Sequence, residues 1–234
     1  ADPARFAILD APAPADAAAA SVAEVRAGRA DALMKGGTDT SVLMHAVLDH
    51  ATGIRDAELL SHVAVLQVDR YPKPLAITDG GVTIAPDLAA KAAIVRNAVR
   101  VTRALGIDRA KVAALAAKEK VVPAMPATVD AAALASMSFE GAVVDGPLAL
   151  DNAIDPHSAR LKGIVSEVAG DADVLLAPDI ETGNLLGKTL QYLGGARLAG
   201  LVVGARVPLV LTSRADDDRC RLDSLALALL VARM

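Results

Sequence analysis

The stretch VPLVLTSRADDDRC, from Val207 to Cys220, sets five apolar residues and a threonine directly before a serine, an arginine and three aspartates. A short apolar run bounded by polar residues is typical of a buried strand. The serine and the aspartates that follow it indicate the start of a helix. An arginine just past a buried strand needs an anionic partner, which is either a neighbouring aspartate or a bound phosphate.

The same strand-to-helix pattern recurs along the chain. Apolar residues follow helical spacing in 86–106, with Pro86 near the start and Gly106 at the end. The run SHVAVLQVDRYPKPLAITDGG (61–81) indicates two strands joined by a Pro-containing turn, and we expect them to pair antiparallel. A terminal helix is predicted from about Asp217 to Arg233. Buried strands that alternate with helices predict an α/β fold, with a mostly parallel sheet covered by helices.

Composition restricts the class of protein. The 234 residues are 53% apolar but only 2% aromatic, and their length suits one large α/β domain or two small lobes. The net charge of -4, with no dense basic face, argues against a nucleic-acid partner. The single Cys220 excludes an intramolecular disulfide and fits a reducing cytoplasm. No apolar run reaches the roughly 20 residues that a membrane span requires.

Four predicted strand ends carry polar residues: KGGTDT (35–40), VDGPLALDNA (144–153), APDIETGN (177–184) and TSRADD (212–217). Ligands bind outside the carboxyl ends of strands in open α/β sheets. Glycines allow close approach of the backbone, and helix N-termini bind anions. The substrate-binding candidates are therefore Lys35, Gly36, Gly37, Thr38, Asp145, Asp151, Asn152, Asp179, Glu181, Gly183 and Asn184.

Structural explanations compete with each of these. Ser213 and Asp216 have the S-x-x-D spacing of a capping box. Cap and turn roles also fit Asp179, Glu181 and Asn184. The four histidines show no metal-ligand spacing, and surface or core positions are expected for them. The sequence contains no phosphate-loop, zinc-protease or serine-hydrolase motif.

Longer segments carry a resemblance to a known family. ITDGGVTIAPDLAAKAAIVRNAV, VDGPLALDNAI, KGIVSEVAGDADVLLAPDIETGNLLGKTL and GARVPLVLTSRAD resemble, in this order, the phosphate acetyltransferase/phosphate butyryltransferase family. The resemblance covers the chain from about Ala30 onward. It implies reversible transfer of an acetyl or short acyl group, such as butyryl, between coenzyme A and inorganic phosphate. It also implies a two-lobed fold similar to isocitrate and isopropylmalate dehydrogenases, and a homodimer.

The resemblance further assigns roles and boundaries. Ser213 and Arg214 lie in the family's cleft and contribute to catalysis, while Cys220 stands where acetyl-specific members have an aspartate base, so Asp216 is the expected substitute. Arginines of those members are replaced near His45 and Tyr192. Family members also carry several dozen residues before the matched part. We expect 1–34 and 213–234 to form part of a first lobe, and 35–212 to form a second lobe with the dimer interface.

The implied mechanism is direct attack of the coenzyme A thiol on an acyl phosphate, without an acyl-enzyme. Asp216 would assist deprotonation, and Arg214 would neutralise developing charge. No metal or permanently bound cofactor is expected. One alternative is an NAD-dependent hydroxyacid dehydrogenase of the same fold, with Asp145, Asp151, Asp179 and Glu181 as metal ligands. The other is a non-catalytic module that binds coenzyme A or phosphate.

Overall fold

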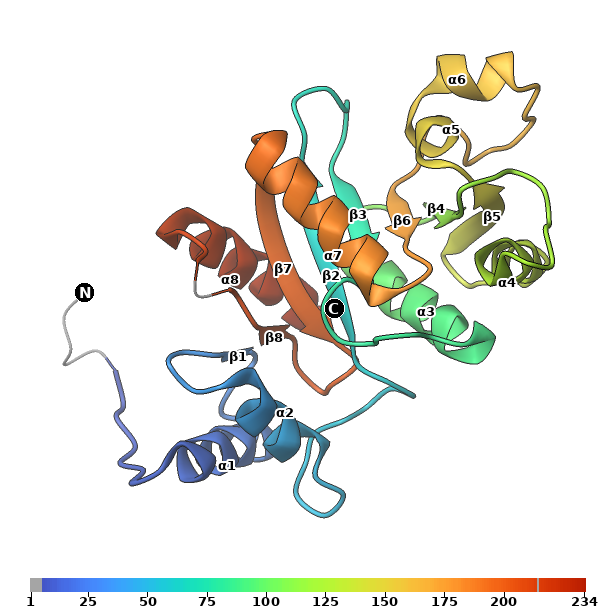
Figure 1. Cartoon of the computed structure of the whole chain (residues 1–234). Coiled ribbons are helices and arrows are strands. Elements are labelled where there is room, and N and C mark those ends of the chain that lie inside the picture. Colours follow the sequence, from blue (N-terminus) through green and yellow to red (C-terminus); the bar gives the residue numbers. More distant parts are fainter. Residues whose placement is uncertain (1–5, 214) are drawn as a thin grey trace.

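A single mixed sheet organises the protein. The computed structural model describes residues 6–213 and 215–234, and within them eight strands form one sheet in the order β1-β8-β7-β2-β3-β6-β4-β5 (Figure 1). The strands are β1 (Leu33–Met34), β2 (Ser61–Gln67), β3 (Leu75–Thr78), β4 (Ala110–Leu115), β5 (Ala142–Leu148), β6 (Val174–Leu176), β7 (Arg197–Val203) and β8 (Leu209–Val210).

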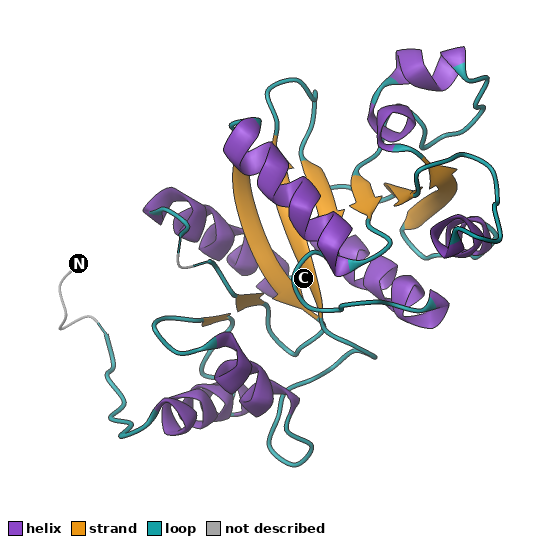
Figure 2. Ribbon diagram, viewed as in Figure 1, coloured by secondary structure: helices purple, strands orange, loops and turns teal. Residues whose placement is uncertain are grey.

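Helices cover both faces of the sheet (Figure 2). They are α1 (Pro14–Arg26), α2 (Thr40–Leu48), α3 (Leu88–Ala104), α4 (Pro126–Ala135), α5 (Leu150–Ile154), α6 (Pro156–Leu161), α7 (Ile180–Lys188), continued by the π-helical turn η2 (Thr189–Leu193), and α8 (Asp218–Ala232). Helices α3, α4 and α8 share one apolar core with the sheet, and residues of α5 and α7 pack into the core on the other face. A third core joins α1 and α2 to β1 and β8.

Strand β2 is apolar on both of its faces because helices pack against each of them. Val63 belongs to the core under α3 and α8, whereas Ala64 and Leu66 belong to the core under α7. Successive side chains of a strand point to opposite faces, so a strand covered on both sides must be apolar at nearly every position. The predicted α/β class and the double covering are confirmed. The expected division into two lobes, at 1–34 with 213–234 and at 35–212, stays a prediction.

Strand direction reverses near the middle of the sheet. β3, β6, β4 and β5 are parallel to one another, and so are β1 and β8. β2 is antiparallel to both β3 and β7, as the sequence predicted for β2 and β3, and β7 is antiparallel to β8. The carboxyl ends of β1 and β8 therefore face the opposite edge of the sheet from those of β3, β5 and β6. The polar strand ends cannot all meet at one edge.

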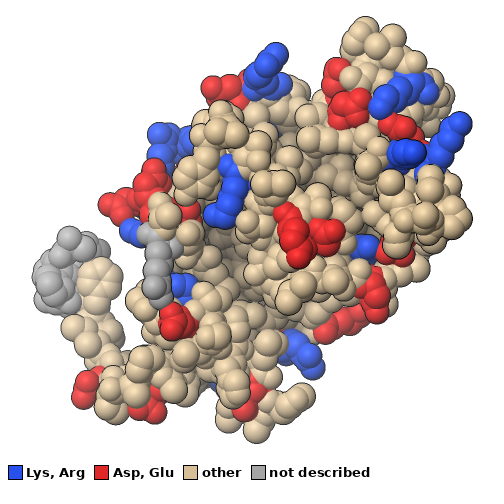
Figure 3. All heavy atoms as spheres, viewed as in Figure 1, with Lys and Arg blue, Asp and Glu red and all other residues tan. Residues whose placement is uncertain are grey.

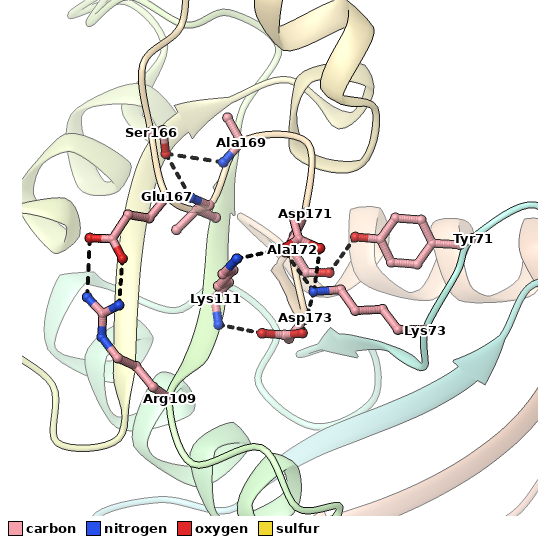
Figure 4. A network of polar contacts seen from close by, with 11 residues as sticks. Tyr71, Lys73, Arg109, Lys111, Ser166, Glu167, Ala169, Asp171, Ala172 and Asp173 are labelled. Carbon is pink, nitrogen blue, oxygen red and sulfur yellow. Dashed lines mark hydrogen bonds and ion pairs between the residues drawn. The ribbon is translucent and has the colours of Figure 1, made fainter.

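A cluster of ion pairs, here called the lysine network (Lys73, Lys111, Asp171 and Asp173), ties the turn between β2 and β3 to the starts of β4 and β6 (Figure 4). Lys73 Nζ lies 2.6 Å from Asp173 Oδ1 and 2.8 Å from Asp171 Oδ1. Lys111 donates from its backbone N–H to Asp173 Oδ2 at 2.8 Å and from Nζ to Asp171 Oδ2 at 2.5 Å. These contacts fix three segments that are distant in sequence.

Lys and Arg are interspersed with Asp and Glu over the face drawn in Figure 3, and no basic patch gathers there. Within the described part of the chain, no helix combines the length and the apolar character needed to span a membrane.

Candidate functional site

The candidate site is a cleft of about 320 Å³ between α7 and the sheet. Helix α7 lies across β7, β2 and β3, from the carboxyl end of β6 toward the opposite edge (Figure 1). The lining residues are Thr40, His62, Ala64, Ile77, Gly80, Gly81, Gly183, Asn184, Gly187, Lys188, Gln191, Leu198, Gly200, Val202, Leu211, Thr212, Ser213, Asp216 and Ser224. The cleft thus reaches from the turn after β3 to the loop after β8.

The floor of the cleft follows from strand alternation. His62 and Ala64 on β2, and Leu198, Gly200 and Val202 on β7, stand at every second position and so share one face. A Cβ atom at Gly200 would lie 3.1 Å from His62 Nε2. The missing side chain at Gly200 therefore makes room for the imidazole ring in an otherwise apolar floor.

The turn after β3 forms one end of the cleft, and Asp79 shapes it. Asp79 is 2% exposed, and its carboxylate accepts hydrogen bonds from the backbone N–H groups of Gly81 at 2.8 Å and of Val82 and Thr83 at 3.0 Å. All of these bonds are local, so Asp79 fixes the path of the glycine turn rather than reaching toward a ligand.

Helix α7 begins directly on that turn. A Cβ atom at Gly183 would lie 2.3 Å from the Asp79 carbonyl oxygen, so a glycine is needed for the two backbones to approach. Asn184 Nδ2 donates to Gly80 O at 3.0 Å and fastens the contact. Asp179 is the N-cap of α7 and accepts from the backbone N–H of Thr182 at 2.8 Å, which is the structural role foreseen for it.

The loop after β8 forms the other end. Asp216 Oδ2 accepts from the Ser213 backbone N–H at 2.7 Å, and Ser213 Oγ accepts from the Ala215 backbone N–H at 3.3 Å. This is only half of the predicted capping box, and it closes a turn before the helix. The N-cap of α8 is Asp217, which accepts from the Cys220 backbone N–H at 2.8 Å. Arg214 lies outside the described residues.

Charge is sparse inside the cleft. Lys188 is exposed on α7, and its ammonium group lies 5.8 Å from the centroid of the Tyr192 ring. Burial lowers the pKa of His62 below its ordinary value, and the charges of Asp79 and Asp216 offset part of this effect. Burial, with the charge of Asp216, raises the pKa of Cys220 to about 11. The Cys220 thiol is therefore protonated at neutral pH.

The structure brings together four of the predicted residues, namely Gly183, Asn184, Ser213 and Asp216. Asp179 and Glu181 belong to the same end of α7 but do not line the cleft. The predicted loop after β1 (35–38) lies beside β8, and Lys35 Nζ turns back onto the carbonyl oxygens of Gly36 and Thr38, each at 3.3 Å. Of the predicted segment KGGTDT (35–40), only Thr40, the first residue of α2, lines the cleft.

Asp145, Asp151 and Asn152 lie elsewhere. β5 is the edge strand farthest from β1 in the sheet order, so its carboxyl end is remote from Ser213. Asp145 accepts from the Gly146 backbone N–H at 2.7 Å, Asp151 lies 3.2 Å from Lys162 Nζ, and Asn152 Nδ2 donates to Glu119 Oε1 at 2.5 Å. Any role of these residues and of 35–38 in substrate binding stays a prediction.

Sequence reasoning missed three contributions to the cleft: the imidazole of His62, the ammonium group of Lys188, and the glycine turn after β3. A signal existed for two of them. ITDGG ends a buried strand in glycines, like the segments that were selected, and His62 stands two positions before Ala64 in an alternating strand. Lys188 carried no such signal, because its place depends on how α7 crosses the sheet.

The carboxylates that a dehydrogenase would need for a metal do not gather. Among residues 6–213 and 215–234, no three His, Cys, Asp or Glu side chains form a group that could hold a metal ion.

Comparison with known proteins adds an independent line of information. A family model described as "Phosphate acetyl/butaryl transferase" matches residues 7–229. The chain is 50% identical to a phosphate acetyltransferase of Rhizobium meliloti, over 97% of this chain and 73% of that protein. It is 44% identical to a phosphate butyryltransferase of Clostridium acetobutylicum, over 97% of this chain and 77% of that protein. The crystal structure of a branched-chain phosphotransacylase from Enterococcus faecalis V583 superposes with a TM-score of 0.90 at 34% identity, covering 96% and 82% of the two chains.

Proposed function

This chain belongs to the phosphate acetyl/butyryl transferase family, and on that premise we propose that the cleft beneath α7 is its active site. The chain is an acyltransferase that moves an acyl group between coenzyme A and inorganic phosphate. One observation carries the assignment of the site. Gly183 and Asn184 on α7, and Ser213 and Asp216 after β8, come from two distant motifs of the resemblance and line one cavity.

The proposed mechanism is a direct transfer. The thiol of coenzyme A attacks the carbonyl carbon of the acyl phosphate, the C–S bond forms, and the C–O bond to phosphate breaks. Negative charge grows on the carbonyl oxygen and on the departing phosphate. Ser213 supplies a hydroxyl donor, and Arg214, assigned here from the sequence alone, supplies a guanidinium. One such preorganised donor is typically worth about 3 kcal/mol in the transition state.

Asp216 is held in place by the Ser213 backbone N–H, and Gln191 Nε2 lies 3.5 Å from its other oxygen. We place the Asp216 carboxylate beside the reacting thiol, where its negative charge stabilises an adjacent group that becomes positively charged during the transfer. Lys188, which also lines the cleft, provides an exposed ammonium group that suits a phosphate.

The acyl group is proposed to lie on the apolar part of the floor. Ile77, Leu198, Val202 and Leu211 line the cleft, and a cavity of about 320 Å³ suits a short chain such as acetyl or butyryl. Acyl-CoA, phosphate and acyl phosphate are then the substrates, with no permanently bound cofactor. A cytoplasmic homodimer is part of the same proposal, and sedimentation analysis of the purified chain tests the dimer.

The test of the function is a thiol-release assay with acyl-CoA of increasing chain length, with and without phosphate. We expect phosphate-dependent release that is greatest for a short acyl group. NADH formation with a 2-hydroxy acid would favour the dehydrogenase, and coenzyme A binding without thiol release would favour the binding module.

Two substitutions test the loop after β8. Arg214→Ala should lower kcat by about 10² to 10³, as expected for the loss of one charge-stabilising donor. Arg219→Ala, on the exposed first turn of α8, is the matched control and should leave kcat within about twofold. Ser213→Ala separates two roles, because a lower melting temperature with normal turnover would make the serine structural only. A folded Arg214→Ala variant with normal turnover would contradict the mechanism.

A further inference from the structure

The histidine in the floor of the cleft is not explained by packing. His62 is on β2, between the buried residues Ser61 and Val63, and its ring faces the cleft under α7. Its Nδ1 atom is buried and has no hydrogen-bond partner within the described residues. Buried polar atoms in native proteins are nearly always hydrogen-bonded, and leaving one unpaired costs about 1 to 3 kcal/mol. An apolar side chain at this position would avoid that cost.

The surroundings hold the ring in place. A Cβ atom at Gly81 would lie 3.0 Å from His62 Cγ, and one at Gly200 would lie 3.1 Å from His62 Nε2. Both contacts are closer than ordinary van der Waals distance, so these two glycines leave space that the imidazole fills. Two glycines from β7 and the turn after β3 thus create a slot for a histidine inside the cavity.

Among the residues that the structure describes, Asp79 at the end of β3 and Asp216 in the loop after β8 act electrostatically on the ring, and Lys188 on α7 lines the same cleft. The Asp79 carboxylate is committed to three backbone N–H groups. Asp216 is committed through Oδ2 to the Ser213 backbone N–H. Asp79 thus accepts hydrogen bonds at both carboxylate oxygens, whereas Asp216 Oδ1 has a 3.5 Å contact with Gln191 Nε2 and is the competing proton acceptor beside the imidazole.

We propose that His62 is the catalytic base that removes the proton from the coenzyme A thiol. This inference rests on the acyl transfer proposed above. As the C–S bond forms, the thiol proton passes to the imidazole. It then passes to the departing phosphate oxygen as the C–O bond breaks, so the products are the thioester and hydrogen phosphate. Asp216 stabilises the imidazolium formed between these two transfers. In the reverse direction the imidazolium returns the proton to the leaving thiolate.

The protonation state agrees with this role. Burial lowers the pKa of His62, so the ring is neutral and able to accept a proton at pH 7. A free thiol has a pKa of about 8.5 and is mostly protonated at that pH, so a base is needed there and becomes unnecessary above pH 8.5.

The test compares His62→Asn with wild type in the thioester-forming direction, from pH 6 to pH 9. At pH 7 we expect kcat to fall by about 10² to 10⁴, the usual contribution of a general base, with the KM for coenzyme A changed less than about threefold. The deficit should shrink at least about tenfold by pH 8.5, because the thiol then ionises unaided. His157→Asn, an exposed histidine on α6, is the matched control and should behave as wild type.

Each outcome decides the question. A folded His62→Asn variant with kcat within threefold of wild type, or with the same deficit at every pH, overturns the inference and leaves the acyl transfer standing. Failure of the wild type itself to release thiol overturns both. If His62→Asn does not fold, His62→Gln replaces it. NMR titration of wild type then gives a second measurement, in which one of the four histidines should titrate below its ordinary pKa and shift when coenzyme A is added. Ordinary titration of all four would contradict the proposal.

Discussion

The cleft and the lysine network treat polar groups in opposite ways. In the network, Lys73 and Lys111 each contact carboxylates at 2.8 Å or less, and the Asp173 side chain is only 7% exposed. In the cleft, Lys188 has no ion-pair partner in 6–213 or 215–234, and His62 Nδ1 has no hydrogen-bond partner there. Polar groups that the protein satisfies fix the fold, whereas groups left unsatisfied near a cavity are available to a ligand.

The cleft and the lysine network also differ in how closely their backbones approach neighbouring atoms. The network holds its segments together through side chains that can be replaced one at a time. The cleft depends on glycines at Gly183 and Gly200, where the backbone itself approaches its neighbours. Substitutions in the lysine network should therefore lower stability, and substitutions in the cleft should lower activity.

The largest effect is expected at Gly183. Alanine would place its Cβ 2.3 Å from the Asp79 carbonyl oxygen, so α7 must move away from the turn after β3. A displacement near 1 Å can cost about 100-fold in rate, and overpacking costs about 1 to 3 kcal/mol of stability. We expect Gly183→Ala to lower kcat/KM by about that factor. Gly187→Ala, one turn later with nothing within 4 Å, should instead stabilise the helix by up to about 1 kcal/mol in urea unfolding. Equal stability of the two variants would contradict the close packing of α7.

The second-largest effect is expected at Lys73, and it concerns the stability of the fold rather than turnover. Within the described part of the chain, Lys73→Met leaves the buried Asp173 carboxylate with only the Lys111 backbone N–H as partner, and we expect a loss of about 2 to 3 kcal/mol in the free energy of unfolding. Arg109→Met breaks an exposed pair with Glu167 and should cost less than about 1 kcal/mol. Both variants should keep wild-type turnover per folded molecule. A large loss of turnover in Lys73→Met would mean that the two regions are coupled.

Acid should weaken the two regions in different pH ranges. Hydrogen bonds from Lys111 and Lys73 lower the pKa of Asp171, so the stability it contributes is present above its ordinary pKa of about 3.9 and is lost as the pH falls through the folded value. The pKa of His62 is lowered by burial, so the unfolded chain binds more protons and stability declines as the pH falls below about 6.5. Unfolding free energies measured from pH 8 to pH 2 should lose the upper step in His62→Asn. The lower step should become smaller in Lys73→Met but persist, because Lys111 still donates to Asp171.

The smallest effect concerns Cys220, beside the loop after β8. Burial raises its pKa to about 11, so at pH 8 only about a thousandth of the thiol is ionised. Iodoacetamide should label the native protein at least about a hundredfold more slowly than the urea-unfolded protein, as followed by mass spectrometry. Fast labelling of the folded chain would place the thiol in the cleft rather than in the core.

Much of the fold was predictable because it depends on local patterns. The strand pair in 61–81 and the helix in 86–106 follow from apolar spacing and from Pro and Gly at the boundaries. The antiparallel pairing of β2 with β7 was not predictable, since it joins segments far apart in sequence. VDGPLALDNA and TSRADD, both polar strand ends, do not meet because β5 and β8 stand far apart in the sheet order.

The candidate site was predicted in part for the same reason. Ser213 and Asp216 follow a strand whose end is visible in the sequence, and Gly183 and Asn184 open a helix. His62 was expected only at a surface or core position, because a lone histidine in an apolar strand shows no metal-ligand spacing and fits a core residue equally well. Its significance comes from Gly81 and Gly200, which only the folded chain places on either side of it.

The pairing of β2 with β7 also has a consequence during protein synthesis. Ser61 pairs with Val203, so one side of β2 lacks its neighbour until about 140 further residues have been synthesised, which takes about 7 to 28 s at roughly 5 to 20 residues per second. An open apolar strand edge is prone to pair with another nascent chain. We therefore expect the segment 61–67 to need protection from such pairing during synthesis.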